Sequence, residues 1–268
     1  MTMSYDYSGK TVFVSGGTSG INLGIAHGFA KAGAKLAVMS RSQDKVDAAI
    51  AELKAHGGEV IGFAADVRDY AAVDAAFKET SQRLGNIDVL ISGAAGNFPS
   101  PAMGISPNGF KSVVDIDLLG TFHVVRAAFP YLTKPGASVI NISAPQAWIA
   151  LEFQMHVCAA KAGVDMVTRV AAIEWGPLGV RVNSISPGPI EGTEGMRRLA
   201  PNERATELVR DSVPMGCFGS TDDIAQAAMW LSSPLARYVT GVVLPVDGGW
   251  SLGGVTAMGS GIKKAMGG

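Results

Sequence analysis

The chain has 268 residues, 47% of them hydrophobic, with 22 basic and 23 acidic side chains and a formal net charge of −1. This size and apolar content suit a single folded domain over 1–268, and no polar linker or composition break divides it. The dispersed basic residues exclude an electrostatic footprint for nucleic acid, and no apolar run reaches the roughly 18 residues of a membrane helix.

A strand, a glycine-rich turn and a helix open the chain. Residues 11–15 are rich in β-branched and aromatic types and predict a buried strand. The turn Gly16-Gly-Thr-Ser-Gly20 follows at once, and Ile21, Ile25 and Phe29 recur behind it at helical spacing. This order places backbone N–H groups and a helix N-terminus where a phosphate can sit.

Strands and helices alternate along the rest of the chain. The patterns predict strands at 35–39, 60–64, 87–91, 137–142, 181–185 and 242–246, and helices at 44–56, 73–84, 108–132, 155–175 and 221–231. Such alternation is typical of a parallel sheet covered by helices on both faces. The predicted fold is α/β, a doubly wound parallel sheet (Rossmann fold), with ligands at the carboxyl ends of the strands.

The residue after the second predicted strand bears on the choice of dinucleotide. Proteins that bind NAD usually have Asp or Glu there, which binds the ribose 2′-hydroxyl. This chain has Ser40-Arg41-Ser42 instead. A guanidinium binds a 2′-phosphate through a fork of N–H groups, whereas an acid would repel it. The sequence therefore favours NADPH (NADP), and the alternative is a surface arginine without a ligand.

Several spaced motifs are similar to those of the short-chain dehydrogenase/reductase family and cover essentially the whole chain. They are the glycine turn, Asp66-Val67, Ala94-Ala-Gly96, Lys161, Pro187-Gly-Pro-Ile190 and Val246-Asp-Gly-Gly249. The resemblance implies that Asp66 binds the adenine amino group and that 187–193 cover the nicotinamide. Together with Arg41, the predicted cofactor-binding residues are then Gly16, Thr18, Ser19, Gly20, Ile21, Asp66, Val67, Ala95, Gly96, Lys161, Pro187, Gly188, Ile190 and Thr193.

One position of the glycine turn departs from the family pattern. Where the family has its third glycine, this chain has Asn22. We expect a side chain there to crowd the approach of the helix. The pyrophosphate contact would then be looser, or the Asn22 amide would make part of it.

The usual catalytic pair of the family is missing. Carbonyl reduction needs an acid at the oxygen, which the family provides with a Tyr four residues before the active-site Lys and a Ser seventeen before it. Counting back from Lys161 gives Val157 and Ala144, neither of which can supply a proton. Strand alternation predicts that the neighbouring Ser143 points to the other face. Ordinary alcohol dehydrogenation is therefore not expected.

An acidic residue stands where the family usually has Asn. Asp117 lies among apolar residues in 113–118, where burial is costly unless the carboxylate is paired. Lys161 is retained, and His156 precedes it by five residues. Two interpretations follow: Asp117 and Lys161 act in catalysis, or Asp117 is a structural partner of Lys161.

Four segments resemble one subgroup of the family, the peroxisomal type of 2,4-dienoyl-CoA reductase: 94–98, 115–122, 154–161 and 187–199. The resemblance implies NADPH as hydride donor, an acyl-CoA substrate, and Asp117 and Lys161 as catalytic residues. It also implies a substrate path lined by Arg68, Phe98, Asn108, His156 and Arg198.

This reaction is compatible with the missing tyrosine. In a 2,4-dienoyl thioester, hydride adds at the far end of the conjugated system, and negative charge appears on the thioester oxygen as a dienolate. The site needs a donor at that oxygen and a proton for carbon, which a water held by Asp117 would supply. Lys161 would grip the nicotinamide ribose. The alternatives are a reductase of another enone or ketone, and a non-catalytic NADPH-binding regulator.

Two predicted helices carry more apolar surface than one sheet face can cover, namely at Val124, Val125, Phe129, Met166 and Val167. In the family the same two helices pair across a two-fold axis. We therefore expect a homotetramer.

Two cysteines and the chain ends bear on the compartment. Cys158 and Cys217 lack metal-ligand spacing and are expected to be unpaired thiols. The N-terminus has no signal-peptide pattern, and the last residues are not the peroxisomal Ser-Lys-Leu signal. We expect a cytoplasmic protein that binds no metal and has no membrane partner.

Overall fold

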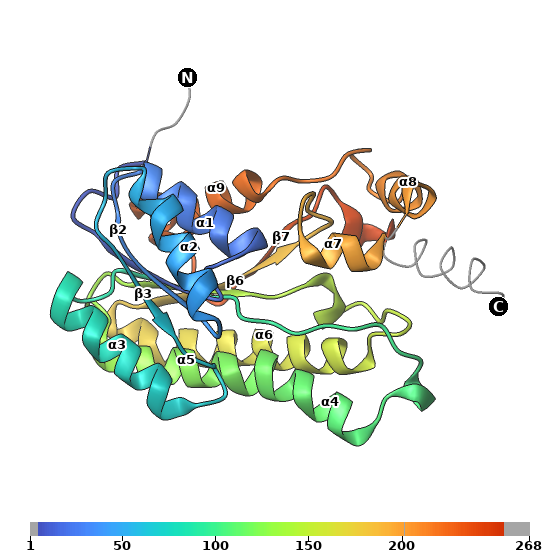
Figure 1. The fold of residues 1–268 in the computed structure, drawn as a ribbon, viewed down its shortest axis with the longest axis horizontal. Coiled ribbons are helices and arrows are strands. Elements are labelled where there is room, and N and C mark those ends of the chain that lie inside the picture. The colour runs from blue at the N-terminus through green and yellow to red at the C-terminus, as the bar shows by residue number, and fades with distance from the viewer. Residues whose placement is uncertain (1–4, 201, 255–268) are drawn as a thin grey trace.

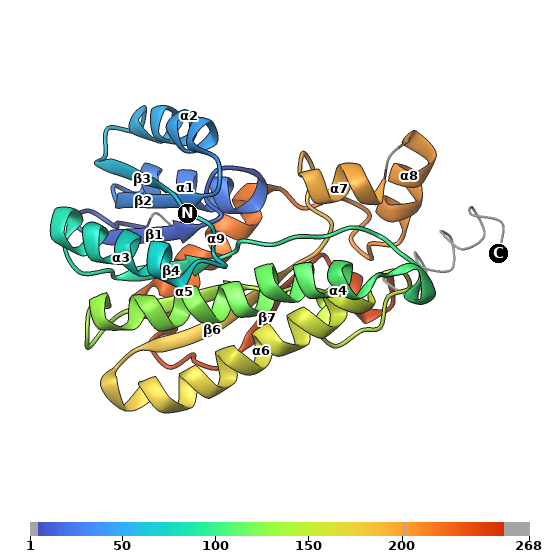
Figure 2. The same cartoon turned by 60° about the horizontal axis from the view of Figure 1, so that its bottom comes forward.

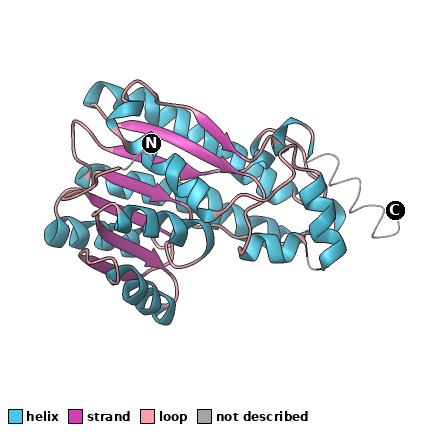
Figure 3. Ribbon diagram, turned by 90° about the horizontal axis from the view of Figure 1, so that it is seen from above, coloured by secondary structure: helices cyan, strands magenta, loops and turns pink. Residues whose placement is uncertain are grey.

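The computed structural model describes residues 5–200 and 202–254, and within them the framework is one seven-stranded parallel sheet. The strand order is β3-β2-β1-β4-β5-β6-β7. The strands are β1 (Thr11–Ser15), β2 (Lys35–Ser40), β3 (Val60–Ala64), β4 (Val89–Ser92), β5 (Ser138–Ile142), β6 (Arg181–Pro187) and β7 (Val243–Val246). Helices cover both faces of the sheet (Figures 1 and 3). The predicted doubly wound α/β fold is confirmed.

The five inner strands of the sheet bury side chains on both faces, whereas the edge strands β3 and β7 are less buried. Val12 and Val14 of β1 pack in one apolar cluster and Phe13 in the other. The first cluster lies under α1 (Gly20–Lys31), α2 (Gln43–Lys54) and α9 (Thr221–Ser232). The second lies under α3 (Tyr70–Leu84), α5 (Gly120–Ala128) and α6 (Met155–Trp175), on the opposite face (Figure 2). Burial on both faces explains why the strands are continuous apolar runs.

Two glycines of α1 allow α9 to approach it closely. A Cβ at Gly24 would lie 2.3 Å from the Cβ of Thr221, and one at Gly28 would lie 2.9 Å from the Cβ of Ala225. Any larger residue would push the helices apart. This contact fixes the position of α1, whose N-terminus follows the glycine turn.

The predicted helix at 108–132 is interrupted by a π-helical turn. It consists of α4 (Pro107–Val114), a π-helical turn (Asp115–Leu119), α5 and a short 3-10 turn (Phe129–Tyr131). Figure 2 shows α4 and α5 in line beside α6. A π-helical turn inside an α-helix is frequent at functional sites, and this one carries Asp117.

Two helices between β6 and α9 were not predicted. They are α7 (Glu194–Leu199) and α8 (Glu203–Asp211), at the carboxyl end of β6 (Figure 1). Both are short and rich in charged residues, so they lack the long apolar period on which the other predictions rest.

The prediction of which apolar side chains form a surface between subunits is partly wrong. Val124 and Val125 are 0% and 3% exposed, because they pack under the sheet. Met166 is exposed as predicted, and the other exposed large apolar side chains of α5 and α6 are Phe122, Met155, Val170 and Ile173, with Leu119 just before α5. No helix within the described residues has the length and apolar character that a membrane span requires.

Candidate active site

A cleft lies at the carboxyl ends of β1 to β4, where a doubly wound sheet binds its ligand. Of the predicted cofactor-binding residues, the cleft contains Gly16, Thr18, Ser19, Arg41, Asp66, Val67 and Ala95. Its other lining residues are Asn22, Met39, Ser40, Lys45, Ala65, Gly93, Ala94 and Ile116. Four loops that are far apart in the sequence therefore meet where the prediction placed the dinucleotide.

The glycine turn and the N-terminus of α1 form one wall of this cleft. Gly16 and Gly20 have φ values of 74° and 54°, which side-chain-bearing residues rarely adopt. A Cβ at Gly16 would lie 3.0 Å from the Ala94 backbone, so the turn approaches the loop after β4 closely. The first N–H groups of α1 have no partner inside the helix and suit the pyrophosphate of a dinucleotide. The residues present therefore fit this cofactor.

Asn22 binds the loop at the other side of the cleft. Its Nδ2 donates a hydrogen bond of 2.8 Å to the Gly93 carbonyl at the end of β4. A Cβ at Gly93 would lie 2.2 Å from the Asn22 Oδ1, so the side chain occupies the space that the glycine leaves. One of the two Nδ2 hydrogens of Asn22 thus binds within the protein, and the side chain also lines the cleft. The pair joins the two loops that form the cleft.

Exchanging the two residues tests this complementarity. We expect Gly93→Asn alone to destabilise the fold by about 1–3 kcal/mol through overpacking, and Asn22→Gly alone by about 1 kcal/mol through the lost hydrogen bond. The double variant Asn22→Gly/Gly93→Asn should recover most of the loss, because the new side chain enters the vacated space. Urea unfolding of all four proteins measures the coupling. Simple additivity of the two single effects would contradict it.

The ribose end of the cleft is positively charged. Arg41 and Lys45 are exposed and both line the cleft. Lys45 was not predicted. It lies in the first turn of α2, which begins two residues after Arg41, and it reaches the same end of the cleft. Asp66 accepts hydrogen bonds from Arg68 at 2.6 and 3.0 Å. These bonds, more than the nearby Arg41, hold the pKa of Asp66 below its usual value.

Asp117 and Lys161 meet in the interior beside the cleft. Asp117 is 1% exposed, and its Oδ1 accepts a hydrogen bond of 2.7 Å from the Gly96 N–H. Its Oδ2 lies 3.4 Å from the Lys161 Nζ, which donates a 2.9 Å hydrogen bond to the Ile142 carbonyl. The π-helical turn, α6 and the loop after β4 thus converge on one carboxylate. The structure pairs Asp117 with Lys161, which is compatible with both the catalytic and the structural interpretation.

No acid stands in the usual positions beside this pair. Val157 is buried in an apolar cluster with Val113 and Ala160. The Ser143 hydroxyl is buried away from solvent, on the side of Asp165. Burial raises the pKa of Asp165, and the hydroxyls near it oppose the shift.

The predicted substrate residues fall into two groups. Phe98 and His156 lie together, with ring centroids 4.5 Å apart. Arg198 joins them through a 2.7 Å hydrogen bond from its Nη1 to the Asn97 carbonyl. Arg68 lies elsewhere, at the end of β3 beside Asp66, and Asn108 is exposed near the start of α4.

The segment expected to cover the nicotinamide reaches back to the glycine turn. Thr193 caps α7, accepting a hydrogen bond from the Met196 N–H and donating one to the Ile190 carbonyl. A Cβ at Gly20 would meet the Thr193 side chain at 3.9 Å. Pro187 ends β6, and Gly188 packs against Asp247, where a Cβ would lie 2.6 Å from the backbone.

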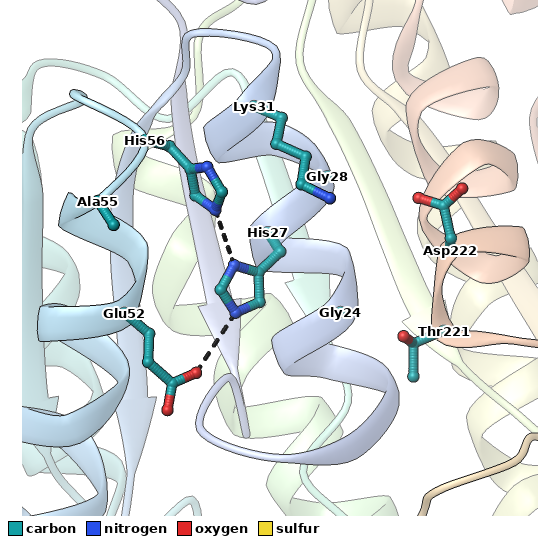
Figure 4. Close-up of a pocket in the computed structure, with 9 residues that line it drawn as sticks. All are labelled: Gly24, His27, Gly28, Lys31, Glu52, Ala55, His56, Thr221 and Asp222. Atoms are coloured by element: carbon teal, nitrogen blue, oxygen red, sulfur yellow. Dashed lines mark hydrogen bonds and ion pairs between the residues drawn. The ribbon is translucent and has the colours of Figure 1, made fainter.

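A larger hollow lies outside the strand ends, between α1, α2 and α9 (Figure 4). His27 is its central side chain, with Nδ1 3.0 Å from the His56 Nε2 and Nε2 3.5 Å from the Glu52 carboxylate. Burial and the neighbouring His27 and Lys31 lower the pKa of His56. No loop at the carboxyl end of a strand reaches this hollow, so we place the dinucleotide in the smaller cleft. Among the described residues no group of three or more His, Cys, Asp or Glu is arranged to hold a metal ion.

The fold, the glycine turn and the buried lysine define a dinucleotide-dependent oxidoreductase class, and comparison with known families agrees. A family model described as enoyl-(acyl carrier protein) reductase matches residues 16–251. The chain belongs to the short-chain dehydrogenase/reductase family, and the family implies a nicotinamide dinucleotide cofactor.

Individual relatives narrow the resemblance. The chain is 42% identical over 251 residues to the peroxisomal 2,4-dienoyl-CoA reductase of Arabidopsis thaliana, covering 90% of this chain and 84% of the relative. It is 38% identical over 243 residues to a probable 2,4-dienoyl-CoA reductase of Bacillus subtilis, covering 90% and 96%. A solved short-chain dehydrogenase from Bacillus anthracis superposes with a TM-score of 0.81 at 36% identity, covering 90% and 96%. The resemblance inferred from the motifs is confirmed.

Proposed function

We propose that the protein is an NADPH-dependent reductase of 2,4-dienoyl-CoA or a similar conjugated acyl thioester. The observation that carries the proposal is the buried Asp117–Lys161 pair, held by the Gly96 N–H in a site with no Tyr or Ser acid. The names of the relatives support the same substrate class.

Asp117 and Lys161 have distinct roles in this mechanism. Bound NADPH supplies the hydride that reduces the far end of the diene. Asp117 holds and orients a water molecule, which gives its proton to carbon after negative charge has moved onto the thioester oxygen. Lys161 binds the nicotinamide ribose and adds positive potential where that charge develops. Hydrogen bonds to the Gly96 N–H and the Ile142 carbonyl hold the Asp117 and Lys161 side chains in place.

The acyl-CoA path is proposed along the two groups of substrate residues. Arg68 and Arg198 are exposed cations suited to the CoA phosphates. Phe98 is half-buried and suits the apolar acyl chain. Asn108, near the start of α4, and His156 complete the path.

A substrate panel tests the proposed function. NADPH absorbance at 340 nm is followed with a dienoyl-CoA, an enoyl-CoA, a ketoacyl-CoA and simple ketones. We expect turnover of the dienoyl-CoA and little of the ketones, because the site has no acid at the carbonyl oxygen. Turnover of ketones alone would identify another short-chain reductase. NADPH binding without any turnover would identify a non-catalytic regulator.

Arg41 should determine the preference for NADPH. Losing a charge-assisted phosphate contact costs about 1.5–3 kcal/mol, which is about tenfold or more in affinity. We expect Arg41→Ala to weaken NADPH binding by at least that factor and to leave NADH binding nearly unchanged. Fluorescence titration with both cofactors measures the effect. Lys54→Ala, an exposed cation at the other end of α2 that does not line the cleft, is the matched control.

An equal loss of affinity for both cofactors in Arg41→Ala would remove Arg41 from 2′-phosphate recognition. Lys45→Ala should show a smaller loss in the same direction, because Lys45 lines the same end of the cleft.

We also propose a homotetramer in which α5 and α6 pair across a two-fold axis. The exposed apolar residues Phe122, Met166 and Ile173 support this interface, with Ile173 76% exposed. We expect sedimentation at micromolar concentration to give four times the chain mass. Ile173→Asp should shift the protein to smaller species. A monomeric parent protein would contradict the proposal.

Two further expectations stand as proposals. One is a single domain over 1–268, which the continuous sheet of the described residues supports. The other is a cytoplasmic location. Cell fractionation tests this location. Several relatives are named as peroxisomal enzymes, so recovery of the protein in peroxisomes is the outcome that would contradict it.

A further inference from the structure

His156 is a buried histidine whose ring nitrogens lack a well-formed hydrogen bond. It is the second residue of α6, five residues before Lys161, and its exposure is 0%. Neither ring nitrogen meets full hydrogen-bond geometry among the described residues, and the nearest polar group acting on the ring is the Phe98 backbone. Such a state costs free energy that a hydrogen bond would recover. The imidazole can therefore form a better hydrogen bond with a bound ligand than it forms in the free protein.

The Phe98 ring covers this imidazole, with centroids 4.5 Å apart and planes inclined by 49°. Phe98 is itself half-buried, so part of its ring faces outward. It lies two residues beyond Gly96, whose N–H binds Asp117. The imidazole is thus covered by the same segment that holds the proposed catalytic carboxylate.

A strained residue lies close to His156 in the chain. Phe153 has a φ of 66°, in the left-handed region that bulky residues rarely adopt. Its carbonyl accepts a 3.0 Å hydrogen bond from the Ser100 N–H, which joins the segment before α6 to the segment after Phe98. Backbone strain held in place by surrounding contacts is frequent at functional sites.

The surroundings of the imidazole favour its neutral form. Burial lowers its pKa, and the Phe98 backbone and the charge of Asp117 oppose that shift. A neutral imidazole carries one N–H donor and one acceptor nitrogen.

The roles proposed so far include no residue that donates a hydrogen bond to the thioester oxygen. The Asp117 carboxylate can only accept, and two of the three Lys161 N–H groups are directed to Ile142 and Asp117. Among the fully buried side-chain atoms without a partner in this region, Gln146 and Gln154 have only a carbonyl oxygen, which cannot stabilise an oxyanion, whereas His156 has a ring N–H.

We propose that His156 is a catalytic residue whose ring N–H donates a hydrogen bond to the thioester oxygen of the bound acyl-CoA, once the Phe98 ring has turned aside. This inference rests on the proposed function and assigns a residue to one of its steps. As hydride adds to the far carbon of the diene, the electron pair moves through the conjugated system to the oxygen. His156 stabilises that charge and keeps its own proton. The water at Asp117 then protonates carbon, and solvent returns a proton to it.

Replacing the donor tests the role by kinetics. His156→Leu should lower kcat on a dienoyl-CoA by about 10²–10³, the usual effect of removing one oxyanion donor, with NADPH affinity unchanged within twofold. His156→Gln keeps an N–H donor and should recover at least tenfold of that loss. Gln154→Leu, the neighbouring buried polar residue, is the matched control and should keep full activity. Equal kcat in His156→Leu and the parent, or equal loss in Leu and Gln variants, would overturn the role.

A binding measurement separates this inference from the proposed function. Hexanoyl-CoA, a non-reactive thioester, is added to the NADP⁺-loaded protein labelled with ¹⁵N-histidine. We expect the resonance missing from His156→Gln to show a shifted N–H signal, and those of His27, His56 and His123 to stay in place. An unchanged His156 signal overturns the inference even when dienoyl-CoA is turned over. A shifted signal without any turnover supports the donor and contradicts only the proposed reduction.

Discussion

Asp117→Asn should leave the protein folded and able to bind NADPH, while kcat on a dienoyl-CoA falls by about 10²–10⁴, the usual worth of a positioned acid or base. The amide keeps the shape of the carboxylate and can still accept the hydrogen bond from the Gly96 N–H. It cannot act as a base toward water, so the proton step is lost together with the charge pairing to Lys161. Stopped-flow turnover and NADPH titration of the same preparation measure the two properties separately.

The structural interpretation of Asp117 predicts a different result. If Asp117 only ties the π-helical turn to Lys161, Asp117→Ala should lower the free energy of unfolding by about 3–5 kcal/mol while activity per folded molecule is preserved. Val157→Tyr added to Asp117→Asn should not restore turnover, because it puts an acid at the wrong end of the conjugated system. Full dienoyl-CoA turnover by a folded Asp117→Asn protein would remove Asp117 from the mechanism.

Lys161→Met should have the largest effect on stability. It leaves the Asp117 carboxylate, 1% exposed, with no cation. Breaking a buried ion pair on one side typically costs about 3–5 kcal/mol, because the remaining charge is buried unpaired. The double variant Lys161→Met/Asp117→Leu replaces the pair with apolar side chains. It should recover most of the stability and stay inactive. Urea unfolding at pH 7 measures the free energies.

An exposed ion pair provides the control for Lys161→Met. Arg83 and Glu79 lie 2.9 Å apart on α3, and both are about half exposed. Arg83→Met should change stability by less than about 1 kcal/mol, since surface pairs contribute little. Two results would contradict this prediction: a loss of less than about 1 kcal/mol in Lys161→Met, or a double variant that is as unstable as Lys161→Met. Either result would show that the remaining buried charge is not what destabilises the fold.

The sequence by itself determined the sheet, the cofactor class and the absence of the usual acid. The strand at 11–15 and the helix at 155–175 were predicted with the bounds that the structure has. Both follow from local patterns, since alternation and helical period record which side chains are buried. The glycine turn could be interpreted in the same way, because its order of strand, turn and helix is local. The missing Tyr and Ser follow from counting residues back from Lys161.

The prediction was weakest where a pattern shows burial without showing the partner. Val124 and Val125 are apolar at helical spacing, and nothing local tells whether a sheet or a second subunit covers them. The helices α7 and α8 are short and charged, so their period is too brief to distinguish from loop. Nothing in the sequence around Lys45, near the start of a helix, indicates a ligand. Lys45 lines the cleft only because the strand order places α2 beside it.

Tertiary structure alone decided the details of the site. Asn22 and Gly93 are 71 residues apart, and their complementarity exists only because β1 and β4 are neighbours in the sheet. The same strand order brings the Gly96 N–H to Asp117 across 21 residues, and a π-helical turn directs that carboxylate inward toward Lys161. Phe98 covers His156 for the same reason. Residue types limit which chemistry is possible, but the distances that make it work are set by the order of the strands and by the packing of helices against them.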